Sequence, residues 1–364
     1  MLTRFFLLLF LLMASVAQAQ SYQPGFRTFG AWQEDPQMRL DINVWYPATR
    51  QAKELNYPPW LINAALQARP AEGRFPLLVI SHASPADRFS YHNLAEYLAK
   101  AGFVVVAPTH GHDCMNNMDD LFTWRQLERR ATEINASLEL ISREKDLAAI
   151  IDQNRIGMIG FGSGATTALL LGGALPNCAG WPAYCGRAGK NDAYCSPWAI
   201  GRMDGLCQEL PLKKSLADQR IKAIAAISPG FGMLFDAQSF THFHPPLLLV
   251  DAGREQFNRP KFHCEPLARL IGSRARYLDL PGADAGSLIA PCSQALAEEL
   301  PELCLSVPAE EKAAIQAKLA STLLAFFRHF LVITPNLPRI PAPPELTQPA
   351  AQSLPALPKT APRK

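Results

Sequence analysis

The feature that most limits the possible folds is a series of apolar runs that alternate with helical segments. The run "FPLLVISH" at 75–82 contains no Asp, Glu, Lys or Arg, which is typical of a strand buried on both faces of a sheet. An amphipathic helical pattern at 91–102 and a second apolar run at 103–108 follow it. Further strands are expected at 40–47, 155–160, 221–229, 246–253 and 275–282, and further helices at 121–153 and 310–332. This alternation predicts an α/β protein with a mainly parallel sheet and helices on both faces.

The size and charge of the chain narrow the class of protein. It has 364 residues, of which 48% are hydrophobic and 18% charged, enough for one large core over about 20–334. The formal net charge is +3. The C-terminal segment 335–364 alone carries +3, because it contains Arg339, Lys359, Arg363 and Lys364 but only one acidic residue, Glu345. The folded part is therefore close to neutral, which argues against nucleic acid as a partner.

The N-terminus has the pattern of a secretory signal peptide. Arg4 precedes an apolar run from Phe5 to Val16, and Ala17 and Ala19 stand at the positions expected before a cleavage site. The apolar run is shorter than the roughly 20 residues that a membrane-spanning anchor needs. We therefore expect residues 1–19 to be a signal peptide that is removed. The mature protein is then expected to be exported, periplasmic or secreted, without an integral membrane span.

Eight cysteines fit an oxidising compartment, where an even count favours disulfide bonds. No Cys-X-X-Cys pair indicates a structural zinc site. Sequence alone leaves the pairing open, although Cys292 and Cys304 flank a short helical stretch and can close a local loop. Disulfides are expected for Cys178, Cys185, Cys195, Cys207, Cys292 and Cys304, with Cys114 and Cys264 as further candidates.

Two segments interrupt the alternation of strands and helices. The segment 176–212 is rich in Gly, Trp, Tyr and Cys and lacks periodicity, so we expect a disulfide-linked insertion over the carboxyl edge of the sheet. Its aromatic residues are expected to fill a small core, or alternatively to form a lid. Prolines recur throughout 335–364, which predicts an extended, disordered tail that is a spacer or binds a protein partner.

The stretch "RIGMIGFGSGATTALLLGG" at 155–173 reads as a strand that turns sharply into a helix. Many hydrolases carry their nucleophilic serine at such a turn, as the central residue of Gly-X-Ser-X-Gly. This turn, the nucleophile elbow, is strained and exposes the serine hydroxyl above the sheet.

Together with this turn, several other segments in the same order resemble the α/β-hydrolase fold. Within it they are similar to the dienelactone hydrolase and platelet-activating-factor acetylhydrolase-like branch. The resemblance spans nearly all of Asp41 to Leu331 and implies carboxylic ester hydrolysis by a Ser-His-Asp triad, without a cofactor. The segments are "DINVWYPAT", "PLLVISHASPADRFSYHNLAEYLAKAGFVVVAPTHGHD", "RIGMIGFGSGATTAL", "RIKAIAAISPG", "PLLLVDAG", "LDLPGADAG" and "APCSQALAEELPELC".

The nucleophile position holds glycine. Aligning the motif with residues 160–164 puts Gly162 at the centre, and glycine has no side chain that can attack an acyl carbon. A shift of one residue would make Ser163 the nucleophile, but Phe161 and Ala165 would then occupy the positions of two small residues. In the unshifted register we expect Ser163 to cap the helix or to lend its backbone N–H to an oxyanion hole.

The other members of the triad are also replaced. The resemblance implies a histidine after the last strand, where Ala285 stands, and an aspartate after the strand at 246–253, where Gln256 stands. Glu255, one place earlier, is a fallback acid, and so is Asp251. No histidine occurs in the sequence between residues 263 and 329, so the expected general base is missing.

The loop that would form the oxyanion hole differs as well. Ala83 and Ser84 occupy its donor positions, and Pro85 removes one backbone donor. The combined changes predict a catalytically degenerate relative, a pseudoenzyme, that binds a small acyl or lipid-like ligand or a protein partner. The alternative is an active esterase or lipase that uses Ser163 or another nucleophile.

A metal-dependent enzyme is a third hypothesis. The segment "PTHGHDCMNNMDD" at 108–120 brings His110, His112 and Asp113 into one loop, and imidazole and carboxylate groups bind transition metals. The resemblance also implies a histidine at position 110 that needs no metal, so our expectation is that the site holds none.

Overall fold

The computed structural model describes residues 22–33, 38–210 and 214–332. The expected signal peptide and the proline-rich tail at 335–364 lie outside these residues. Within them, no helix is long and apolar enough to cross a membrane.

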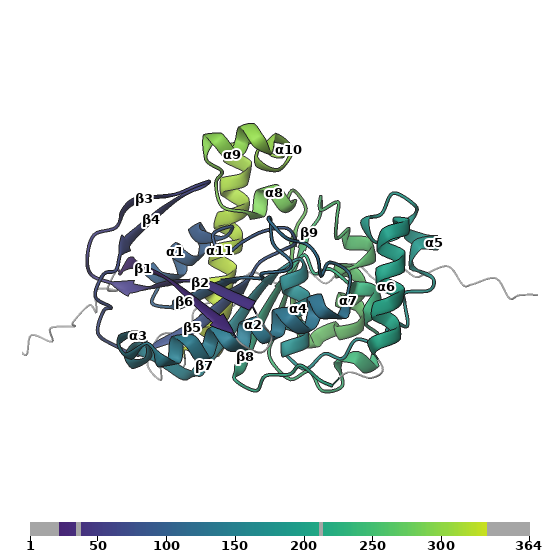
Figure 1. Ribbon diagram of the computed structural model, residues 1–364, viewed down its shortest axis with the longest axis horizontal. Helices are drawn as coiled ribbons and strands as arrows, with labels where there is room; N and C mark the ends of the chain where they lie inside the picture. The colour runs from purple at the N-terminus through teal and green to yellow at the C-terminus, as the bar shows by residue number, and fades with distance from the viewer. Residues whose placement is uncertain (1–21, 34–37, 211–213, 333–364) are drawn as a thin grey trace, which may run out of the picture.

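A ten-stranded sheet organises the chain, with the order β10-β9-β8-β7-β5-β6-β2-β1-β4-β3 (Figure 1). The strands β5 to β10 are parallel to one another, whereas β2 is antiparallel to both β6 and β1. The edges are formed by β10 and β3. The strands are β1 (Gln23–Gln33), β2 (Met38–Ala48), β3 (Lys53–Tyr57), β4 (Trp60–Leu66), β5 (Phe75–Ser81), β6 (Val104–Thr109), β7 (Ile151–Phe161), β8 (Ile221–Ile227), β9 (Leu247–Ala252) and β10 (Ala275–Leu280).

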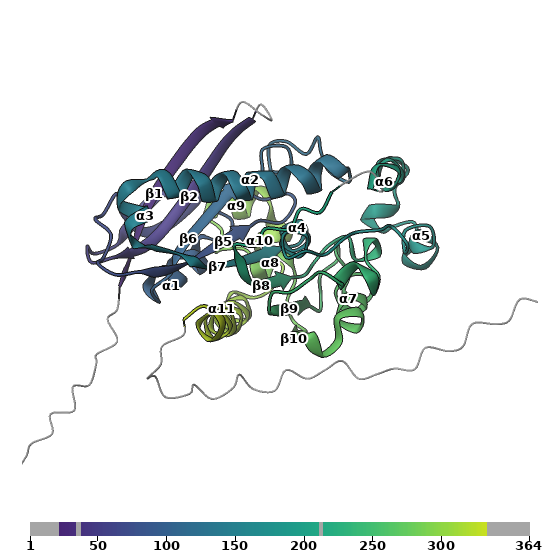
Figure 2. The same cartoon turned by 90° about the horizontal axis from the view of Figure 1, so that it is seen from below.

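Helices cover both faces of this sheet, as Figure 2 shows with α2 and α11 on opposite sides. The alternation of side chains along β5 explains the two layers. Leu77 and Val79 join the core beneath α2 and α4, while Leu78 and Ile80 join the core beneath α1 and α11. The helices are α1 (His92–Lys100), α2 (Trp124–Arg143), α3 (Lys145–Ile150), α4 (Ser163–Leu171), α5 (Tyr184–Ala188), α6 (Pro197–Glu209), α7 (Cys264–Ile271), α8 (Ala285–Leu288), α9 (Gln294–Glu299), α10 (Pro301–Cys304) and α11 (Ala309–Leu331). The predicted parallel sheet with two helical layers is confirmed.

The disulfide-linked insertion contains helices that its sequence, which lacks periodicity, did not indicate. The segment 176–212 contains α5 and α6, and α6 begins at a favourable site because the Ser196 side chain accepts a hydrogen bond from the Ala199 N–H and Pro197 occupies the first turn. The helical segments expected over 121–153 are α2 and α3, and they end before residue 153 because β7 already begins at Ile151.

Three disulfide bonds are present, which indicates an oxidising environment. Two of them, Cys178–Cys207 and Cys185–Cys195, lie within the insertion, and Cys292–Cys304 closes the loop around α9. Cys114 and Cys264 are free, buried thiols, so the suggestion that they form disulfides is wrong.

Candidate functional site: the elbow at Gly162 and the polar network beside it

The turn from β7 into α4 has the backbone of a strained elbow. Gly162 has φ 54° and ψ −116°, a conformation that glycine adopts readily and other residues rarely do. Its N–H donates to the Ile227 carbonyl at 3.0 Å, and its carbonyl accepts from the Gly230 N–H at 3.2 Å. The neighbouring strand β8 and the loop after it therefore fix this turn.

Gly160 and Gly164 explain why the turn needs glycines on either side of its centre. A Cβ at Gly160 would lie 2.1 Å from the Gly164 carbonyl oxygen, and a Cβ at Gly164 would lie 2.1 Å from the Ser81 carbonyl oxygen. Neither position can accept a larger residue without moving the backbone. Gly160 and Gly164 therefore match the two outer glycines of the Gly-X-Ser-X-Gly motif, with Gly162 at its central position.

The space in front of Gly162 is largely filled. A Cβ at this position would lie 3.1 Å from the Ala83 Cβ and 3.3 Å from the Asn258 side-chain nitrogen. The Tyr194 hydroxyl holds that amide by donating to the Asn258 Oδ1 at 2.9 Å, and it accepts from the Phe231 N–H at 3.3 Å. Tyr194, which lies in the insertion at 176–212, therefore holds the Asn258 side chain in front of Gly162.

Ser163 begins α4 directly after this turn, and its hydroxyl is almost fully buried. Its Oγ lies 2.8 Å from the Ser84 Oγ. Because Ser84 donates its own proton to the Asp113 carboxylate at 2.7 Å, Ser163 is the donor in the pair of serines. The helix cap is Gly162, and no side chain caps it, so the expectation that Ser163 caps the helix is wrong.

The residues at the expected acid and base positions do not form a triad. Gln256 is exposed, and its amide donates to the Arg254 carbonyl. Glu255 is buried, which raises its pKa, and it accepts from the Phe257 N–H at 2.8 Å. Ala285 is exposed at the start of α8. In the described part of the chain, neither Glu255 nor Gln256 makes a hydrogen bond to a histidine.

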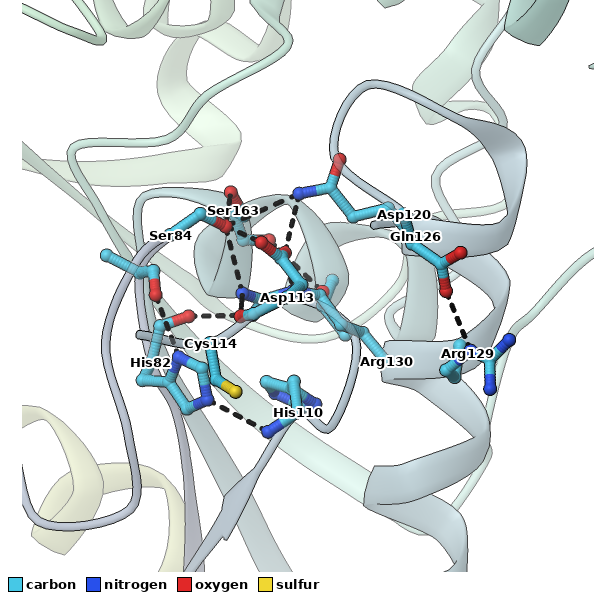
Figure 3. A network of polar contacts seen from close by, with 12 residues as sticks. His82, Ser84, His110, Asp113, Cys114, Asp120, Gln126, Arg129, Arg130 and Ser163 are labelled. Carbon is cyan, nitrogen blue, oxygen red and sulfur yellow. Dashed lines mark hydrogen bonds and ion pairs between the residues drawn. The ribbon is translucent and has the colours of Figure 1, made fainter. Parts of the chain in front are cut away.

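A buried ion pair lies behind the two serines, as Figure 3 shows. The Arg130 Nε donates to the Asp113 Oδ2 at 2.6 Å, and both side chains are nearly inaccessible. Burial alone would raise the pKa of Asp113, but Arg130 and hydrogen bonds from Ser84 and Gln126 bring it below its ordinary value. A carboxylate with a lowered pKa is a weak base, so it cannot activate the serine hydroxyls.

A second buried set has the hydrogen-bond order of a catalytic triad. The Ser81 Oγ lies 2.8 Å from the His110 Nε2, and the His110 Nδ1 lies 2.5 Å from the Glu133 Oε2. These residues come from the ends of β5 and β6 and from α2, and each is at most 1% exposed. Burial raises the pKa of Glu133 to about 8 and lowers that of His110. No substrate can reach Ser81 without opening the core.

The proposed metal ligands do not converge. His110 faces Ser81 and Glu133, Asp113 faces Arg130, and the His112 ring lies near the Asn117 amide. Across residues 22–33, 38–210 and 214–332, no group of three or more His, Cys, Asp or Glu side chains is arranged to hold a metal ion. The hypothesis of a metal centre built on His110, His112 and Asp113 is therefore wrong.

The aromatic residues of the insertion are mainly core. Trp181, Tyr184 and Tyr194 are buried, whereas Trp198 is 54% exposed. His263 joins this layer to the body of the protein: its Nδ1 accepts from the Gly232 N–H at 3.1 Å, and its Nε2 lies 2.9 Å from the Tyr184 hydroxyl. Burial lowers the pKa of His263 to about 4, so its role here is that of a neutral structural residue.

Sequence reasoning missed Asn258 and Arg130, and it included Tyr194 only among the aromatic residues of the insertion. Nothing in the spacing links Asn258 to Tyr194, which lies 64 residues away, or either of them to Gly162. Arg130 lies in the charged stretch "RQLERR" of α2, where an arginine is usually exposed. The only available signal was its position on the apolar face of that helix, in line with Leu127 and Ile134.

Comparison with known proteins supports the fold and gives no closer relationship. No family model matches the chain, and no curated protein sequence matches it. Among solved structures, a ferulic acid esterase from Streptomyces cinnamoneus matches with a TM-score of 0.55 and 17% identity, covering 93% of this chain and 96% of the esterase. A chain described as a dipeptidyl aminopeptidase IV from Bacteroides ovatus matches with a TM-score of 0.46 and 10% identity, covering 85% of this chain and 36% of that one.

The esterase matches over nearly the whole of both chains, and the sheet order and the elbow at Gly162 agree with that likeness. At 17% identity the likeness describes the fold and leaves the chemistry to the site residues. The protein has an α/β-hydrolase fold.

Proposed function

We propose that this protein is an exported pseudoenzyme of the dienelactone hydrolase and platelet-activating-factor acetylhydrolase-like branch. Its signal peptide is removed after Ala19, and the mature chain binds a small acyl or lipid-like ligand or a protein partner. The observation that carries the proposal is the elbow itself. Its backbone is strained, its centre is Gly162, and Ala83 and Asn258 lie 3.1 and 3.3 Å from the place of a Cβ at this position.

The state of Ser163 supports the same conclusion. A serine attacks an acyl carbon only when a base removes its proton. Ser163 donates that proton to Ser84, and the carboxylate beyond Ser84 is already paired with Arg130. An active ester hydrolase that uses Ser163 would need an imidazole that this hydrogen-bond network does not supply.

A fluorophosphonate probe tests the proposal directly on the purified mature protein. We expect no labelling and no hydrolysis of p-nitrophenyl acetate, p-nitrophenyl butyrate or methyl ferulate above the background rate. An unrelated active serine esterase, treated in parallel, checks the probe. Stoichiometric labelling that disappears in Ser163→Ala would overturn the proposal and establish the alternative, an active esterase.

The Gly162→Ser variant sharpens this test. We expect it to remain unlabelled and inactive, because position 285 supplies no general base and position 256 supplies no carboxylate.

Extraction of the purified wild-type protein followed by mass spectrometry then identifies any acyl or lipid-like molecule that it carries.

A further inference from the structure

A polar cleft lies beside the first strands of the sheet, separate from the elbow. Its volume is about 340 Å³, equivalent to roughly ten water molecules. The wall consists of the start of β2, the loop after β5, the end of β6 and the loop that follows it. The lining residues are Arg39, Asp41, Arg88, Thr109, Gly111, His112, Cys114 and Asn116.

Arg88 is held in place by neutral partners. Its Nε donates to the Asn43 Oδ1 at 3.2 Å, and its Nη1 donates to the Thr109 Oγ1 at 3.2 Å. Asn43 is completely buried, so the guanidinium has a rigid anchor. Its Nη2 makes no hydrogen bond or ion pair to any residue in the described part of the chain. The guanidinium is therefore fixed in position by uncharged partners, and its Cζ lies 5.1 Å from the centre of the Phe89 ring.

Among the described residues that line the cleft, Asp41 is the only one with a carboxylate. Asp41 pairs with Arg39, whose Nε lies 3.0 Å from its carboxylate. Asp87 accepts from the Phe89 N–H and the Ser90 hydroxyl. Glu133 does not line the cleft: it lies behind Gly111, where its carboxyl group contacts the Gly111 N–H and the His110 ring. The two arginines and one aspartate that line the cleft leave a single excess positive charge.

We propose that this cleft binds a small monovalent carboxylate through Arg88. A guanidinium with a free edge forms charge-assisted, often bidentate, hydrogen bonds with a carboxylate. One excess positive charge matches one negative charge, whereas a divalent anion would bring an unpaired charge close to Asp41. The site does not depend on the elbow, so it stands whether or not the protein hydrolyses esters.

Binding of butyrate, compared with its neutral isostere butyramide, tests the proposal. At constant ionic strength we expect butyrate to raise the melting temperature of the wild-type protein and to give a calorimetric binding isotherm, while butyramide does neither. Arg88→Gln is expected to weaken butyrate binding at least about tenfold, since one charge-assisted contact is lost. Arg143→Gln, which removes an exposed arginine at the end of α2, is the matched control and should bind as the wild type does.

Cys114 provides a second readout that needs no substitution. Cys114 is 7% exposed and is one of the residues that line the cleft, while Cys264 is 1% exposed and is not among them. We expect butyrate, but not butyramide, to slow the alkylation of Cys114 by iodoacetamide, with Cys264 unreactive throughout. If Arg88→Gln fails to fold, the comparison of butyrate with butyramide on the wild-type protein still decides the proposal.

Three results would overturn the proposal. The first is equal stabilisation by butyrate and butyramide, or by neither of them. The second is unchanged butyrate affinity in a folded Arg88→Gln variant. The third is tighter binding of inorganic phosphate than of butyrate, because that would contradict the match of one charge to one charge.

Discussion

The elbow at Gly162 and the buried set Ser81–His110–Glu133 each keep half of what a catalytic triad needs. The elbow has the strained backbone and the helix behind it, but no reactive side chain. The buried set has a hydroxyl, an imidazole and a carboxyl group in hydrogen-bond order, but almost no exposure. Catalysis requires both the chemistry and access for the substrate, and in this fold the two have been separated. A search for the elbow motif alone, or for a Ser-His-Glu set alone, would therefore identify an active site where the other requirement is missing.

The largest expected effect concerns the ion pair behind the serines. Replacing Arg130 with Met leaves the Asp113 carboxylate buried without its partner, and we expect a loss of roughly 3–5 kcal/mol in the free energy of unfolding. Arg143→Met, on the same helix, breaks the exposed pair with Glu139 and should cost about 1 kcal/mol or less. Urea unfolding of both variants measures the difference. Equal losses would mean that the network beside the elbow is not the stabilising element that its burial indicates.

An intermediate effect is expected at the elbow. Gly162 and Gly272 have similar backbone angles, the latter with φ 59° and ψ −139°, yet a Cβ at Gly272 would meet nothing within 4 Å. Alanine at either position should cost about 1–3 kcal/mol in backbone strain. Gly162→Ala should lose about 1 kcal/mol more, because Ala83 and Asn258 crowd the new Cβ. A smaller loss at 162 than at 272 would show that the space in front of the elbow is open.

The smallest expected effect is a change in pH dependence. Burial raises the pKa of Glu133 from 4.5 to about 8, so its contribution to stability is fully present below 4.5 and is lost as the pH rises through 8. Burial lowers the pKa of His110, and that opposite trend ends near the ordinary histidine value of about 6.5. Between about pH 6.5 and pH 8 the wild type should therefore lose stability with a slope that Glu133→Gln makes shallower.

Urea titrations at the two ends of that pH window measure the slope for each protein. A slope that is the same in the wild type and in Glu133→Gln would show that Glu133 is already ionised at neutral pH, and the buried set would then hold a charge.

The sequence predicted the central strands well, because a strand that is buried on both faces of a sheet has apolar residues at nearly every position. The runs at 75–82, 103–108 and 221–229 correspond to β5, β6 and β8. β1 escaped prediction because its segment "QPGFRTFGAWQ" mixes Pro, Gly and Arg with apolar residues. That strand forms eleven residue pairs with β2, the next strand along the chain, and this backbone pairing does not require an apolar period in the sequence.

The candidate site was predictable only in part, for a similar reason. The glycine at position 162 could be read directly from a motif with fixed spacing. The crowding by Asn258 and Ala83, and the anchoring of Arg88 by Asn43, depend on segments that the fold brings together from distant parts of the chain. A single sequence does not encode such contacts in any spacing rule, so these residues had to come from the structure.

The two edges of the sheet have a consequence for the behaviour of the protein at high concentration. An edge strand offers unpaired N–H and carbonyl groups to a strand of another molecule, which is a route to aggregation. In this protein the edge strand β3 carries exposed Lys53 and Glu54, and the edge strand β10 carries exposed Asp279. A strand added from a second molecule would have to desolvate these charges, so both ends of the sheet are protected against open-ended polymerisation.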